Sequence, residues 1–119
     1  MLVIKTDSYV DVCAFAHLEP LWGEAALIDD QQVALFLMPD GTLYAVSNQD
    51  PATGSFVMSR GIVGSKGAAH TIASPLHKQV YSLESGECFT NPDLQLPTFA
   101  VRVVEGRVQV ARQPRVTSV

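Results

Sequence analysis

The sequence predicts an all-β domain, a sandwich or barrel of short antiparallel strands. Short runs rich in β-branched and aromatic residues recur along the chain, and turn residues separate them every eight to twelve positions or so. The last two of these runs alternate apolar and polar residues, the pattern of a strand with one buried face. At 119 residues the chain is expected to form a single domain with a proper hydrophobic core.

The N-terminal part supplies the first group of expected strands. They lie at Tyr9–Cys13, Ala25–Ile28, Gln32–Met38 and Thr42–Ser47. Between the first two strands Pro20 precludes a long helix, so residues 15–20 are expected to be irregular. Asp29-Asp30 fits a hairpin turn. Pro39-Asp40-Gly41 turns the chain again, because proline fixes φ and glycine accepts a positive φ.

Residues 53–68 interrupt this rhythm. Ser55–Arg60 has room for a turn or two of helix, with Ser55 as its cap. The glycines at 61, 64 and 67 then predict a flexible surface loop. This loop does not match a phosphate-binding loop, because its spacing is not GxxxxGK[ST] and no long helix follows it.

The C-terminal part is expected to form hairpins. Its expected strands are His70–Ala73, Gln79–Leu83, Glu87–Phe89, Thr98–Val104 and Arg107–Ala111, with turns at Glu84-Ser85-Gly86 and Glu105-Gly106. In the last hairpin the apolar positions alternate, at Val101 and Val103 and again at Val108 and Val110, which predicts one core face and one solvent-exposed face. Gln113–Val119 contains Pro114 and has no periodic partner, so it is expected to be a loose tail.

The charge and the termini exclude several classes of function. A net charge of −4 argues against nucleic acid as a partner, since its binders need a cationic surface. No apolar run approaches the ~20 residues that a transmembrane helix needs. The first seven residues lack the charged leader and apolar stretch of a signal peptide. We therefore expect a cytoplasmic protein with no membrane association.

The reactive side chains do not make a recognisable catalytic or metal motif. Cys13 and Cys88 are too few and too far apart for a disulfide framework, and we expect them to be buried thiols. His17 and His70 have no ligand partners at metal-binding spacing. Asp50, Ser74 and His77 supply the residue types of a hydrolytic triad, but Ser74 has no nucleophile elbow.

Several short motifs, in a fixed order, carry a family resemblance. They are Asn48-Gln49-Asp50-Pro51, Ser59-Arg60-Gly61, Ala73-Ser74-Pro75-Leu76 with Lys78-Gln79, and Leu83-x-x-Gly86-x-Cys88. From about Tyr9 to Ala111 the chain resembles the small subunit of assimilatory NAD(P)H-dependent nitrite reductase. The resemblance implies a Rieske-like (ISP-type) domain of stacked antiparallel sheets over residues 1–112. It also implies a small inserted loop subdomain at about 48–80, with 113–119 as the tail.

The same resemblance implies that the cluster of a Rieske protein is absent. Rieske ligands come from Cys-Pro-His and Cys-Pro-x-His loops, because one iron takes two thiolates and the other two imidazoles. The corresponding positions here are Asp50, Ala52, Ser74 and His77, so only the histidine is retained. We expect no cofactor in this chain. Asp50 and Ser74 are expected to hydrogen-bond the loop amides that a cluster would otherwise organise.

The implied function is that of a non-catalytic small subunit. In the family that it resembles, a large subunit carries FAD, an iron–sulfur cluster and sirohaem, and reduces nitrite to ammonium in nitrate and nitrite assimilation. Arg60, Lys66, His77 and Lys78 lie in or beside the two loops and are the candidates for contacting that partner. The alternatives are a Rieske-type [2Fe-2S] ferredoxin that supplies an oxygenase, and a free-standing binding module.

Overall fold

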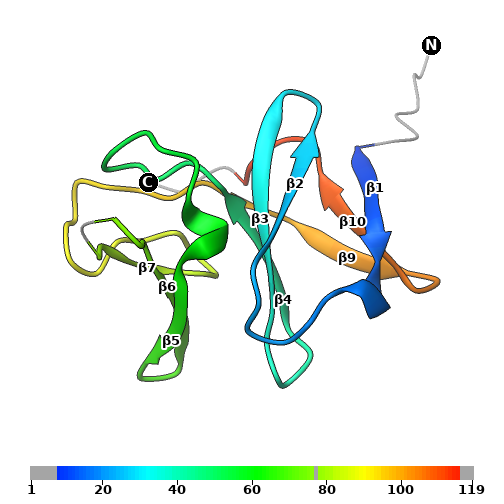
Figure 1. The fold of residues 1–119 in the computed structure, drawn as a ribbon, viewed down its shortest axis with the longest axis horizontal. Helices are drawn as coiled ribbons and strands as arrows, with labels where there is room; N and C mark the ends of the chain where they lie inside the picture. Colours follow the sequence, from blue (N-terminus) through cyan, green and yellow to red (C-terminus); the bar gives the residue numbers. More distant parts are fainter. Residues whose placement is uncertain (1–7, 77, 116–119) are drawn as a thin grey trace, which may run out of the picture.

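Three antiparallel sheets follow one another across the molecule in the computed structural model, which describes residues 8–76 and 78–115 (Figure 1). The first sheet has the order β1 (Tyr9–Ala14), β10 (Arg107–Ala111) and β9 (Val101–Val104). The central sheet has the order β2 (Glu24–Ile28), β3 (Gln31–Leu37), β4 (Leu43–Ser47) and β8 (Thr98–Phe99). The third has the order β5 (Ile62–Lys66), β6 (Ala69–Ala73) and β7 (Val80–Ser82). The predicted all-β class is confirmed.

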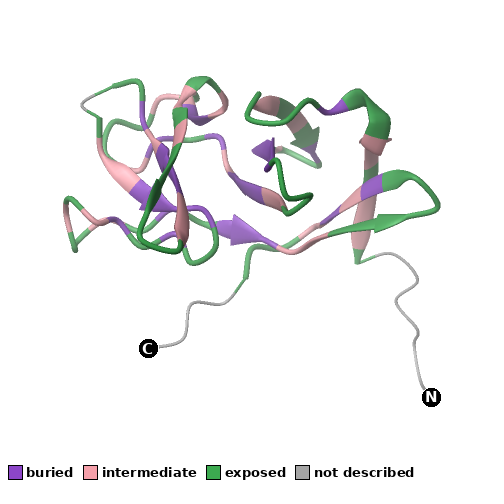
Figure 2. Ribbon diagram, turned by 90° about the horizontal axis from the view of Figure 1, so that it is seen from below, coloured by how far each residue is buried: buried purple, intermediate pink, exposed green. Residues whose placement is uncertain are grey.

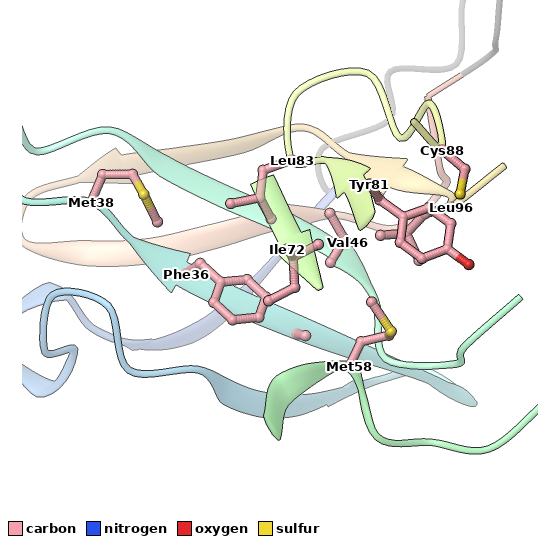
Figure 3. Packing of buried hydrophobic residues seen from close by; sticks show 10 residues of the cluster. Phe36, Met38, Val46, Met58, Ile72, Tyr81, Leu83, Cys88 and Leu96 are labelled. Carbon is pink, nitrogen blue, oxygen red and sulfur yellow. The ribbon is translucent and has the colours of Figure 1, made fainter. Parts of the chain in front are cut away.

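The central sheet is covered on both faces, and strand β3 shows why. Residues 33–38 are a continuous apolar run, and every one of them is buried. Since successive side chains of a strand point to opposite faces, Val33 and Leu35 pack toward Val108 of the first sheet. Phe36, from the alternate set, packs with Ile72 of the third sheet (Figure 3). Buried residues accordingly line the middle of the molecule in Figure 2.

The closing hairpin is confirmed in its turn but not in its length. The expected strand Thr98–Val104 is interrupted at Ala100: β8 pairs with β4 in the central sheet, and β9 pairs with β10 in the first. The strand is interrupted at this residue because the chain passes from the central sheet to the first sheet. Val108 and Val110 are fully buried as predicted, whereas Val103 is 46% exposed. β9 is an edge strand, so this valine is covered on one flank only.

Residues 53–68 correct two expectations. Only Met58–Arg60 is helical, as a single 3-10 turn (η2), and Val57 precedes it without any side-chain cap, so Ser55 is not a helix cap. The glycine-containing run that follows is strand β5, not a flexible loop, and it pairs along its whole length with β6. Gly67 adopts a φ of +60° in the hairpin turn, a conformation that glycine accepts without strain.

Smaller differences lie at the ends of elements. Phe15–His17 forms a 3-10 turn (η1) within the segment that was expected to be irregular. Glu87–Phe89 is not a strand: Cys88 and Glu87 make only isolated bridges, to Tyr81 and Gln95. In the predicted tail, Arg115 donates its amide to the carbonyl of Thr98 at 2.7 Å. Neither helical turn in the described residues is long enough to cross a bilayer.

Candidate functional site

The two loops singled out in the sequence meet through their polar side chains. Asp50 follows β4, and Ser74 directly follows β6. The Ser74 hydroxyl donates a hydrogen bond to Asp50 Oδ2 at 2.5 Å. Asp50 is 0% exposed and Ser74 is 1% exposed, so this bond is shielded from solvent. We call this pair the loop latch.

Each member of the latch also orders its own loop. Asp50 Oδ1 accepts the amide of Ala52 at 2.8 Å, and Ser74 Oγ accepts the amide of Leu76 at 3.1 Å. The Asp50 backbone exchanges bonds with its loop as well, donating to Ser55 O and accepting from Gly54 N, both at 2.7 Å. The expectation that Asp50 and Ser74 bind loop amides is confirmed. Their direct bond to each other was not predicted.

Asn48 fixes the position of the first loop through its hydrogen bonds, a role that was not predicted from the sequence. Its side chain is buried, accepts the amide of Ser59 at 2.7 Å and donates to Gln32 Oε1 at 3.0 Å. The backbone carbonyl of Asn48 accepts a hydrogen bond from the amide of Met58 at 3.0 Å. One asparagine therefore connects β3, the end of β4 and the η2 turn. The available signal was a polar turn residue directly after a strand.

Tyr81 is a second residue that sequence reasoning missed. It lies on β7 directly after the second loop, it is 0% exposed, and its hydroxyl has no hydrogen-bond partner in the described part of the chain. Burial, with the nearby Asp50 carboxylate as a smaller cause, raises the pKa of Tyr81 to about 12. The tyrosine is therefore neutral near pH 7. Figure 3 shows it among the apolar side chains that join the central and third sheets.

The donors at these loops do not fit a Rieske cluster. A cluster needs two thiolates and two imidazoles, and iron–sulfide centres select soft sulfur ligands. Asp50 and Ser74 instead offer hard oxygen atoms, which are already hydrogen-bonded to each other, and Ala52 offers only a methyl group. His77, the fourth position, lies outside the described residues. No group of three His, Cys, Asp or Glu side chains within 8–76 and 78–115 is arranged to hold a metal ion.

The cysteines do not compensate for the missing ligands. Cys88 is buried in the core beside Tyr81, and its thiol contacts Thr90 Oγ1 at 3.3 Å. Cys13 is half-buried on β1 of the first sheet, and burial raises the pKa of its thiol. Both are unpaired. The expectation of two buried thiols is thus confirmed for Cys88 and only in part for Cys13.

The structure also argues against hydrolysis at the latch. A serine nucleophile transfers its proton to a base and needs access to substrate. The Ser74 hydroxyl donates directly to the Asp50 carboxylate, and the serine is 1% exposed. His77, the third residue type of the triad, lies outside the described residues, and the described His70 is hydrogen-bonded to the Tyr44 hydroxyl at 2.8 Å through its Nδ1.

The predicted partner-binding cations are spread over the third sheet. Arg60 is exposed at the end of η2 and precedes β5. Lys66 ends β5, roughly 13 Å along the strand from its first residue, Ile62, at ~3.3 Å per residue. Its ammonium stands 5.6 Å from the centre of the Phe89 ring. Lys78 is exposed in the second loop, with a φ of +54°. The described cations therefore do not form one compact cluster.

Comparisons with known proteins identify relatives along nearly the whole chain. The family described as "Rieske-like [2Fe-2S] domain" matches residues 8–111. The NADH nitrite reductase small subunit of Escherichia coli K12 is 35% identical over 105 residues, covering 87% of this chain and 97% of its own. A crystal structure from Mycobacterium tuberculosis, described as an NADH-dependent nitrite reductase small subunit, is 46% identical. It superposes with a TM-score of 0.85 and covers 88% of this chain and 95% of its own.

One further relative has a different architecture. The nitrite reductase [NAD(P)H] large subunit of Klebsiella oxytoca contains a segment that is 30% identical to this chain over 102 residues. That match covers 86% of this chain but only 11% of the Klebsiella protein. A domain of this kind is therefore also found joined to a much longer polypeptide.

Proposed function

The chain belongs to the family of Rieske-like nitrite reductase small subunits, and from this membership we propose that it acts as a non-catalytic, cofactor-free subunit of a nitrite reductase [NAD(P)H]. The observation that carries the cofactor-free assignment is the loop latch. Asp50 and Ser74 bond to each other at ligand positions where a cluster would need thiolates. The two loops are thus held together by a hydrogen bond between protein side chains.

The partner of this subunit is the large subunit of the same enzyme. In Klebsiella oxytoca a domain similar to this chain is part of the large-subunit polypeptide. Joining two modules in one chain gives them a high effective concentration, which is useful only when they act together. This supports a working complex in which each large subunit is accompanied by a domain of this kind.

The chemistry of the complex belongs to the large subunit. There FAD, an iron–sulfur cluster and sirohaem are expected to pass electrons from NADH or NADPH to nitrite, which is reduced to ammonium. The described residues of this chain supply no redox group for that route, so its contribution is to stabilise and shape the large subunit. We place the complex in the cytoplasm, in the assimilation of nitrate and nitrite.

Two finer assignments are part of the same proposal. The domain is assigned to residues 1–112, of which 1–7 and 77 lie outside the described residues, and its loop subdomain to about 48–80, which the separate β5–β6–β7 sheet supports. Arg60, Lys66, His77 and Lys78 remain the candidate partner contacts. Arg60 has the strongest support, because it is exposed and takes part in none of the ion pairs among the described residues.

A Rieske-type ferredoxin is the less favoured reading. It would need ligands at Asp50, Ala52 and Ser74, and these side chains provide two oxygen donors and a methyl group. The relatives at 30–46% identity are described as nitrite reductase subunits rather than as ferredoxins.

Gentle affinity purification of the tagged chain from its own cells tests the proposal. We expect a large chain to co-elute with flavin and sirohaem absorption, and we expect the colour to leave with the large chain when the complex is separated. The separated small subunit is then incubated with iron and sulfide under reducing conditions. We expect no Rieske absorption or electron paramagnetic resonance signal. A stable [2Fe-2S] spectrum in this chain alone would contradict the proposal.

A further inference from the structure

An open groove of about 630 Å³ lies between the segment that precedes β2 and the segment that precedes and begins β5. Leu21 and Trp22 line one side, and Arg60 and Ile62 line the other. The groove lies beside the start of β5, an edge strand whose outer side pairs with no other strand in the described residues. It is distinct from the loop latch, whose side chains are buried.

Two glycines allow close backbone packing around the groove: Gly23 brings its two walls together, and Gly61 brings one wall against strand β6. A Cβ atom on Gly23 would lie 2.2 Å from the carbonyl oxygen of Ser59, and a Cβ on Gly61 would lie 2.5 Å from that of Ala73. Such distances are far inside van der Waals contact, so the backbones pack directly against each other. The amide of Leu21 also donates to Leu37 O at 2.8 Å, which fixes this wall to β3.

The groove walls expose large apolar side chains that are not buried against any other part of the described chain. Trp22 is 65% exposed, Ile62 is 71% exposed and Leu21 is 54% exposed. Leu21 also adopts a φ of +68°, a conformation that costs a non-glycine residue about 1 kcal/mol or more. Strain on a residue that stays in solvent is not offset by burial of its side chain. Exposed apolar residues gathered at a groove mark an interaction site.

Arg60 is the one charged residue among the described residues that line the groove, and its positive charge favours a partner with a negative group at this position. Arg60 lies on the rim, and none of the ion pairs among the described residues involves it, although the whole chain carries a net charge of −4. Tryptophan and arginine are among the residue types enriched at the energetic centres of interfaces. A guanidinium beside an apolar surface is complemented by a carboxylate beside an apolar side chain.

We propose that this groove is the docking site for the large subunit of nitrite reductase, whose contacting segment presents an aspartate or glutamate to Arg60 and an apolar side chain to Trp22 and Ile62. This inference rests on the proposed function and deepens it by naming the surface. It adds Trp22, Leu21 and Ile62 to the predicted contacts.

The affinity of the chain for purified large-subunit holoenzyme, measured by biolayer interferometry, tests the inference. We expect Trp22→Ala, Ile62→Ala and Arg60→Glu each to weaken binding about tenfold or more, as truncation at interface centres does. Leu27→Ala is the matched control, because Leu27 is 70% exposed on β2 and lies outside the groove. We expect its affinity to stay within about twofold of wild type, as for surface changes outside an interface. Circular dichroism confirms that every variant is folded.

The only tryptophan of the chain provides a second readout that does not depend on variants. Labelling the small subunit with 5-fluorotryptophan gives one ¹⁹F resonance, from residue 22. We expect unlabelled large subunit to shift or broaden this resonance.

The possible outcomes separate the two proposals. If wild type binds the large subunit but the groove variants bind equally well and the resonance does not move, the docking surface is wrong and the proposed function stands. If wild type does not bind the large subunit at all, the proposed function fails and the inference fails with it. If Trp22→Ala instead abolishes a wild-type dimer in sedimentation velocity and leaves large-subunit binding unchanged, the occupant is a second copy of this chain.

Discussion

The Ser74 hydroxyl donates a 2.5 Å hydrogen bond to the Asp50 carboxylate and so links two loops that lie 24 residues apart in the sequence. Both side chains are buried, and each also accepts an amide of its own loop. In a Rieske protein the cluster ligands link the corresponding loops. Here a hydrogen bond from the Ser74 hydroxyl to the Asp50 carboxylate links the two loops in place of a metal cluster.

Asp50→Ala is expected to loosen both loops. The substitution removes the acceptor for Ser74 Oγ and for the Ala52 amide, and it leaves buried donors without a partner. We expect the free energy of unfolding to fall by about 1–3 kcal/mol. Urea unfolding measures this loss, and hydrogen exchange should show faster exchange of the amides in residues 48–60.

Asp40→Ala is the matched control for that experiment. Asp40 also accepts an amide two residues ahead, from Thr42 at 2.9 Å, but it is exposed in its turn. Its loss should cost less than that of Asp50. In a double-mutant cycle, Asp50→Ala and Ser74→Ala should show a coupling energy of about 0.5–3 kcal/mol, as contacting residues do. Strictly additive effects would contradict the latch.

Gly23→Ala is expected to destabilise the fold and to weaken binding of the large subunit. Its new Cβ would meet the Ser59 carbonyl oxygen, so the two walls of the groove must separate. Overpacking of this kind costs about 1–3 kcal/mol, which thermal unfolding can measure. Gly64→Ala is the control, since its Cβ would meet only the Thr71 side chain, at 3.3 Å. Equal losses in the two variants would argue against a close backbone contact between the groove walls at Gly23.

Tyr81→Phe is expected to leave the stability unchanged or to increase it, because the buried hydroxyl that it removes makes no hydrogen bond in the described residues. Tyr44→Phe should instead destabilise by about 0.5–1.5 kcal/mol, since the Tyr44 hydroxyl bonds His70 Nδ1 at 2.8 Å. Urea unfolding of both variants distinguishes the two cases. A large loss of stability in Tyr81→Phe would contradict the prediction, because it would mean that the Tyr81 hydroxyl makes a hydrogen bond in the folded protein.

The raised pKa of Tyr81 also predicts a loss of stability in alkali. Its folded value of about 12 lies above the ordinary tyrosine value of about 10. The unfolded chain therefore ionises first as the pH rises, so this contribution is complete below about pH 10 and is lost toward pH 12. Absorbance at the tyrosinate band during a pH titration follows it. The Tyr81→Phe variant should lack this part of the decline.

The ion pair between Asp11 and Arg107 predicts the opposite sign in acid. Arg107 contacts the carboxylate at 2.7 Å across β1 and β10, and this hydrogen bond lowers the pKa of Asp11. A lowered folded pKa means that the contribution is present above the ordinary value of about 3.9 and is lost as the pH falls through the folded value. Urea unfolding at pH 6 and pH 3 should show this loss in wild type. Asp11→Asn should show less of it.

Local sequence signals predicted most of the strands and turns. The apolar run of β3 predicted a buried strand, and Pro39-Asp40-Gly41 predicted the turn into β4, because both depend on neighbouring residues alone. The prediction was wrong for β5, whose glycines favour a loop when taken by themselves. That segment is a strand because β6 supplies its hydrogen bonds from the other side of a hairpin turn. Local propensity is weak where pairing decides the outcome.

The sequence by itself determined the all-β class, the family and the absence of thiolates at the ligand positions, because residue types and their order carry that information. Only the tertiary structure decided that Ser74 bonds to Asp50 and that Trp22 and Arg60 line one groove. Residues so far apart along the chain meet through the packing of three sheets. Such distances depend on every strand register between them, and no short motif encodes them.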